Sequence, residues 1–127
     1  MTTDLGLLLL RVGFGGMLFL GHGWSKLVGF SGMKAMFPDP LHIGHTASLA
    51  LATFAEVFCA LAVMIGVFTR LASIPIIITM LVAVSIVLYG ASWQTKELPI
   101  LFMLGFAAIA LAGPGSWSVD WVSRKKK

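Results

Sequence analysis

Long apolar runs separated by short polar or turn-rich pieces define the pattern of the chain. Four such runs cover Leu5–Gly29, His45–Phe68, Leu71–Gly90 and Leu98–Ala112. A membrane-spanning helix needs roughly 20 mostly apolar residues, and the last run approaches that length only when it extends back through Glu97. The runs lack the two-residue alternation of barrel strands, so helices are the structure that satisfies the backbone in lipid. We predict an all-α fold, a four-transmembrane-helix bundle that forms a single domain over residues 1–127.

Composition supports a membrane protein and removes several other classes. Apolar residues make up 58% of the chain and charged residues 11%, and the mean hydropathy is +0.97. These values are outside the range of a soluble domain of this size. We assign the net charge of +4 to membrane topology and lipid contact, and we do not expect nucleic acid as a partner. The lone cysteine, Cys59, excludes a disulfide within one chain and dithiol chemistry.

Basic residues predict the orientation of the bundle. The densest cluster is Arg124–Lys127 at the end of the chain, and Arg70 lies in the short connection between the second and third runs. A four-span chain places both on the same side of the membrane. Because Lys and Arg are enriched on the cytoplasmic side, we predict that both termini are cytoplasmic.

The connection between the first two runs, Ser31–His45, is too long for a tight turn. Its apolar residues Met33, Met36 and Phe37 predict a short interfacial segment on the outer membrane surface, ended by a Pro-Asp-Pro sequence. His42 and His45 have the i, i+3 spacing of two metal ligands, but the loop offers few further ligands. We therefore predict no metal site.

Polar residues inside the spans predict a pocket. At about 100° per residue, Arg11, His22 and Lys26 share one face of the first helix, whereas Trp24 faces lipid. Glu56 lies near the middle of the second span on a face of mostly small residues, which is typical of helix packing. We expect His22 or Lys26 to contact Glu56. Glu97 begins the fourth helix on the same outer side.

Ionisable groups within a span indicate function by default, and the alternative is a structural network that fixes helix register. The candidate ligand-binding residues are His22, Lys26, Glu56 and Glu97, and the candidate catalytic residues are His22 and Glu56. We assign structural roles to the remaining polar residues near the inner side. Arg11 is expected to snorkel or to pair with Asp4 or Asp120, and Asp120 to cap a turn or to pair with Arg70.

The sequence resembles the DoxX family of small bacterial membrane proteins along nearly its whole length. The resemblance rests on "LLLLRVGFGGMLFLGHGWSKLVGF", "FAEVFCALAVMIGVFTRLASIPIIITMLVA" and "KELPILFMLGFAAIALAGPGSWSVD". It implies a four-helix bundle in the bacterial inner (plasma) membrane. It also implies membrane redox chemistry, because one DoxX-like protein is a subunit of a thiosulfate:quinone oxidoreductase. No cofactor is expected to be built in, so redox work by this chain would require a diffusible quinone or a soluble or membrane oxidoreductase partner.

Three hypotheses follow for function. In the first, the protein is a subunit of a quinone-linked redox assembly with an outward-facing pocket, in which His22 exchanges a proton, Glu56 relays it and Lys26 sets the charge. In the second, the same residues form the relay of a small transporter, which at this size requires a homo-oligomer. In the third, the chain is a membrane scaffold without chemistry of its own.

Overall fold

The computed structural model describes residues 2–125, and within that range the chain forms helices and turns without any strand. Four helical stretches are long and apolar enough to cross a membrane, as the sequence predicted. They are span 1 (Thr2–Val28), span 2 (His45–Ile65), span 3 (Thr69–Val87) and span 4 (Trp93–Ala112). Lys126 and Lys127 of the predicted basic cluster lie outside the described residues.

Three of the spans contain a π-helical segment. Span 1 consists of α1 (Thr2–Leu18), η1 (Phe19–Gly23) and α2 (Trp24–Val28); span 2 of α4 (His45–Thr53), η2 (Phe54–Cys59) and α5 (Ala60–Ile65); span 3 of α6 (Thr69–Val82) and η3 (Ala83–Val87). Span 4 is the single helix α7 (Trp93–Ala112). Two short helices, α3 (Phe30–Met33) and α8 (Val119–Lys125), lie between spans 1 and 2 and at the end of the chain.

The boundaries of the spans differ from the predicted runs by a few residues. Span 4 begins at Trp93 instead of Leu98, because Ser92 has an extended backbone and the polar residues after it fit an exposed first turn. Gly66 follows the last residue of span 2 and has a φ of 80°, which glycine adopts readily; Gly113, with φ 87°, follows span 4 in the same way.

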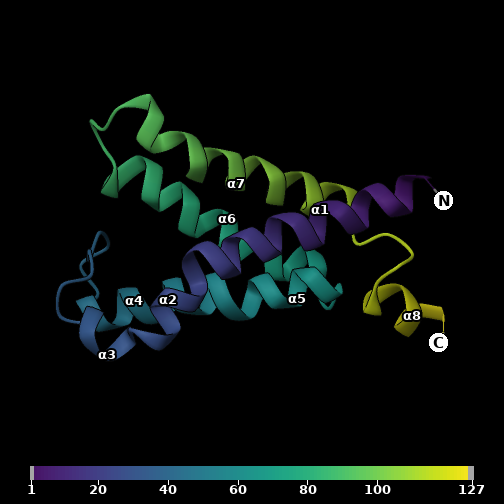
Figure 1. Ribbon diagram of the computed structural model, residues 1–127, viewed down its shortest axis with the longest axis horizontal. Helices are drawn as coiled ribbons and strands as arrows, with labels where there is room; N and C mark the ends of the chain where they lie inside the picture. Colours follow the sequence, from purple (N-terminus) through teal and green to yellow (C-terminus); the bar gives the residue numbers. More distant parts are fainter. Residues whose placement is uncertain (1, 126–127) are drawn as a thin grey trace.

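The spans are arranged as two groups, spans 1 and 2 in one and spans 3 and 4 in the other. The groups meet at one end and diverge at the other (Figure 1). Helices α6 and α7 pack side by side, while α1 packs against both α5 and α7. Both termini lie at the end where the groups meet, which we call the proximal end; the opposite end is the distal end. Span 2 is the central element, with 50% of its most apolar stretch buried against 17–22% in the others.

The proximal end is fixed by two charged side chains that act on the same turn. Arg11 is fully buried and donates hydrogen bonds to the carbonyls of Val63 (3.3 Å), Met64 (2.9 Å) and Trp117, of which the first two end α5. Asp120 accepts bonds from the Phe68 amide (2.8 Å) and from the Thr69 amide and hydroxyl, at the start of α6. The turn between spans 2 and 3 is therefore capped from both sides.

This arrangement decides between the expected roles of these residues. Arg11 binds backbone carbonyls in the core and does not snorkel to the membrane surface. Asp120 caps a turn, as expected, whereas the guanidinium of Arg70 lies against Gly113 at the end of span 4.

Candidate functional site

A cavity of about 450 Å³ lies at the distal end, where the two groups of helices diverge. All four spans and the loop between spans 1 and 2 contribute to its lining, which is mostly apolar. Its polar lining residues are His22, Lys26, Ser48, Glu56, Thr79 and Thr95. The volume falls in the range of about 300–1,000 Å³ that is usual for small-molecule sites. We call it the distal cavity.

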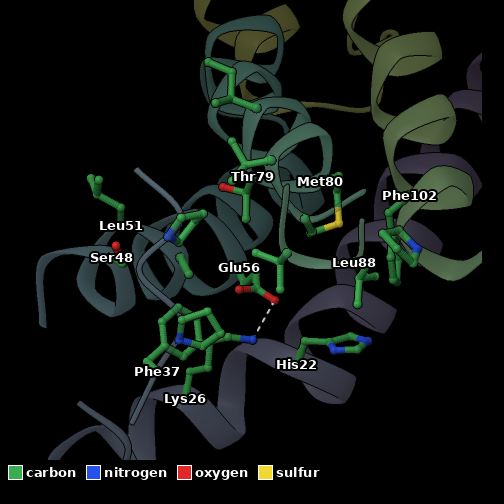
Figure 2. Close-up of a pocket in the computed structure, with 18 of the residues that line it drawn as sticks. His22, Lys26, Phe37, Ser48, Leu51, Glu56, Thr79, Met80, Leu88 and Phe102 are labelled. Carbon is green, nitrogen blue, oxygen red and sulfur yellow. Dashed lines mark hydrogen bonds and ion pairs between the residues drawn. The ribbon is translucent and has the colours of Figure 1, made fainter. Parts of the chain in front are cut away.

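An ion pair between spans 1 and 2 forms the most polar part of its wall. Lys26 Nζ lies 3.0 Å from Glu56 Oε1, and the two side chains are only 15% and 5% exposed (Figure 2). This is the contact that the sequence predicted. A charged pair in apolar surroundings is costly to bury, so each partner depends on the other.

Lys26 keeps hydrogen-bonding capacity beyond this pair. An ammonium group has three N–H donors, and one of them donates to Glu56. The ring centroid of Phe37, from the loop, lies 6.0 Å from Nζ, which is within range of a cation–π contact. Lys26 is thus a cation held between a carboxylate and an aromatic face, with donors left for a ligand.

His22 lines another wall of the same cavity and points away from the ion pair (Figure 2). Its ring meets Phe102 edge-on, with the centroids 5.9 Å apart. Our expected contact partner for Glu56 is therefore Lys26 and not His22. The π-helical turn η1 (Phe19–Gly23) explains the difference, because its extra residue per turn rotates the side chains away from an ideal α-helical face.

Glu97, which we expected to share this pocket, is not among the residues that line the cavity. Glu97 is exposed, and span 4 instead contributes Thr95, Leu98, Pro99 and Phe102 to the lining. Those residues follow the i, i+3, i+4, i+7 spacing of one helix face, and Glu97 is rotated off that face.

The π-helical segments surround the distal cavity, a feature that the sequence did not reveal. His22 lies in η1, Glu56 in η2, and Ala83 and Val87 of η3 also line the cavity. Such segments interrupt the regular hydrogen-bond ladder and occur frequently at functional sites. Apolar sequence around them carries no signal that distinguishes a π-helical turn from an α-helical one.

The loop between spans 1 and 2 also belongs to the site. Phe37, Pro38, Pro40, Leu41 and Ile43 line the cavity, so the segment predicted to lie at the membrane surface also covers the distal cavity. Its shape is fixed by Asp39, which accepts hydrogen bonds from the amides of Ile43 (3.0 Å) and Gly44 (2.9 Å) and from the Ser48 hydroxyl (2.8 Å).

These hydrogen bonds also act on the charge of Asp39. Partial burial raises the pKa of Asp39, but the bonds from Ser48, Gly44 and Ile43 outweigh it and hold that pKa below its ordinary value. The loop is thus anchored by an ionised carboxylate. Among the described residues, no group of three His, Cys, Asp or Glu side chains is placed to bind a metal ion.

These features define an integral membrane protein of four spans with a distal cavity whose wall contains an ion pair. The chain belongs to the DoxX family, whose pattern matches residues 6–89. It is also similar to a protein of Mycobacterium tuberculosis named Uncharacterized membrane protein Rv3486, with 27% identity over 128 aligned positions that cover 83% of this chain and 74% of that protein. No solved structure matches the chain.

The family match places the ion pair inside the shared region and Glu97 outside it. Residues 6–89 include Lys26, Glu56 and the loop that covers the distal cavity, as well as His22. Membership in the family therefore agrees with the sequence-based resemblance in fold, and it leaves the activity to be argued from the site.

Proposed function

We propose that the distal cavity binds the polar head of a lipid-soluble ligand of the quinone class and that the protein is a subunit of a membrane redox assembly. The observation that carries this proposal is the Lys26–Glu56 ion pair in the wall of a mostly apolar cavity between spans. Intramembrane charges are rare and mark ligand or ion sites by default.

The residues present fit such a ligand. A quinone head group is a flat apolar ring with carbonyl oxygens, and the remaining donors of Lys26 suit one of those oxygens. Phe37 and Phe102 offer aromatic walls. Leu51 lines the cavity and is also more than half exposed, which suits an apolar tail that continues into lipid.

The titratable groups suit proton exchange with the same ligand. Full reduction of a quinone takes up two electrons and two protons. Glu56 and His22 stand on different walls of the cavity and are the groups that we assign to proton exchange. The electrons would come from a soluble or membrane oxidoreductase partner, since we assign no electron-carrying group to this chain.

A transporter relay receives less support from the packing. On span 1, the buried positions between the charged residues Arg11 and Lys26 are Gly15, Leu18 and Gly23. On span 2, the buried residues between Glu56 and the proximal end include Cys59, Ala60 and Val63. On spans 1 and 2, this stretch of apolar core separates the distal ion pair from the proximal end, and the buried hydroxyl of Ser73 on span 3 donates to the Thr69 carbonyl of its own helix. A relay requires polar groups in sequence.

We further propose that the protein resides in the bacterial plasma membrane with both termini cytoplasmic. The basic residues Arg70 and Arg124 are exposed at the proximal end, which supports the positive-inside assignment. A periplasm-dependent reporter fused after Lys127 should be silent, and the same reporter inserted in the loop after Met36 should be active. The opposite pattern contradicts the orientation.

Direct binding tests the proposed ligand. Purified protein in detergent is titrated with a short-chain benzoquinone, and binding is measured by equilibrium dialysis for the wild type, Lys26→Met and Glu56→Gln. Lys34→Met removes the same charge at an exposed position outside the cavity and serves as the matched control. Saturable binding that falls at least tenfold in the cavity variants and persists in the control is expected. Equal binding in all four proteins contradicts the proposal.

A further inference from the structure

A second cavity, of about 870 Å³, lies at the proximal end and is separate from the site described above. The starts of spans 1 and 3, the end of span 4, the Gly113–Gly115 turn and α8 surround it. We call it the proximal cavity. Its lining combines polar groups with apolar side chains such as Leu71, Phe68 and Trp121, all of which are exposed.

The charges in the proximal cavity are not equally available to a ligand. The carboxylate of Asp120 accepts bonds from Phe68 and Thr69, and that of Asp4 accepts a bond from the Ser116 amide. Both acidic groups are thus engaged by the protein itself. The two arginines that line the cavity, Arg70 and Arg124, are exposed.

Arg70 occupies a position that suits a headgroup contact. It is in the first turn of span 3, and its guanidinium lies against Gly113 at the end of span 4. From Arg70, exposed apolar side chains continue along the same helix at helical spacing, Leu71, Ile74, Ile78 and Leu81. A charged end followed by an apolar stripe matches the shape of a phospholipid.

We propose that the proximal cavity binds the phosphate headgroup of an anionic phospholipid through Arg70 and Arg124, with one acyl chain along the stripe from Leu71 to Leu81. Guanidinium groups bind phosphate oxygens in pairs of hydrogen bonds. Basic pockets between spans are known to accept anionic lipid headgroups. The apolar stripe favours a lipid over free phosphate, because an acyl chain can pack along the stripe and a free anion cannot.

The test uses purified full-length protein in neutral detergent. Thermal unfolding is followed while phosphatidylglycerol, phosphatidylcholine or inorganic phosphate is added, and retained lipids are counted by native mass spectrometry. Phosphatidylglycerol is expected to raise the midpoint saturably, and phosphatidylcholine and inorganic phosphate to leave it unchanged. Removing one basic group near a membrane surface weakens anionic lipid binding by about fivefold, so Arg70→Gln and Arg124→Gln should each show a loss of that size.

Lys34→Gln is the matched control, since it removes a charge from an exposed residue at the other end of the molecule. Its lipid response should equal that of the wild type. An equal response to inorganic phosphate would assign the site to a free anion and overturn the lipid proposal. An unchanged response in both arginine variants, each checked for helical content, would also overturn it. None of these outcomes depends on quinone binding at the distal cavity.

Discussion

Gly23 packs directly against the backbone carbonyl of Glu56, and a side chain at this position would overlap that oxygen. The approach brings spans 1 and 2 together beside the Lys26–Glu56 ion pair. Two independent features of span 1 thus act on one residue of span 2: the absence of a side chain at Gly23 and the ammonium of Lys26. Small residues at such crossings let membrane helices approach closely.

Replacing Gly23 with alanine should therefore destabilise the protein. Overpacking of a tight contact typically costs about 1–3 kcal/mol, which chemical unfolding in detergent would measure. Gly21→Ala provides the control, because a methyl group there meets nothing within 4 Å. That control should be neutral or slightly stabilising, since alanine favours helix by up to about 1 kcal/mol over glycine. Equal effects at the two positions would refute the close approach.

The ion pair predicts energetic coupling between its partners. Lys26→Met or Glu56→Gln alone leaves a charge or polar group without its partner, and such losses reach roughly 3–5 kcal/mol for buried pairs. The double variant should be less damaging than the sum of the single variants by more than about 0.5 kcal/mol, the limit for independent sites. The cycle of His22→Ala with Glu56→Gln should be additive, because His22 points elsewhere. Additivity in the Lys26 cycle contradicts the pair.

Arg11 should be the most sensitive charged residue of the proximal end. Its fully buried guanidinium bonds three carbonyls, and hydrogen bonds to charged groups contribute about 1.5–3 kcal/mol. We expect Arg11→Met to cost at least that amount and to speed amide exchange in the turn between spans 2 and 3. Arg70→Met, at an exposed position, should stay within about 0.5 kcal/mol in lipid-free detergent. Similar losses in the two variants would argue against the capping role.

Acid should weaken the same turn through Asp120. Partial burial raises the pKa of Asp120, but hydrogen bonds from Thr69 and Phe68 and the charge of Arg11 outweigh it and leave that pKa below its ordinary value. A carboxyl with a lowered folded pKa stabilises the fold above its unfolded pKa of about 3.9, and this contribution is lost as pH falls through the folded pKa. Between pH 6 and pH 3, the thermal midpoint of the wild type should approach that of Asp120→Asn. A constant difference would contradict this role.

The sequence predicted the fold well because lipid imposes simple requirements on length and hydropathy. All four spans lie where the apolar runs indicated, and Lys26 meets Glu56 as expected.

The site was less predictable because its geometry depends on irregular backbone. The π-helical turn at Phe19–Gly23 turns His22 toward Phe102. Glu97 is a separate case, because it lies in a regular helix but off the face that lines the cavity. The contribution of Phe37 depends on the Asp39 hydrogen bonds that fold the loop back over the cavity. These bonds join residues of a loop, and a hydropathy pattern does not predict the conformation of a loop.

Photoaffinity labelling tests the central claim most directly, that the distal cavity holds the head of a quinone-type ligand. Membranes containing the protein are irradiated with an azidoquinone, and labelled peptides are mapped by mass spectrometry. Labels are expected on the loop around Phe37 or on span 4 around Phe102, with competition by unlabelled quinone and loss in Lys26→Met. Labels spread over exposed span residues such as Leu9 and Leu104, insensitive to competitor and to Lys26→Met, would contradict the account.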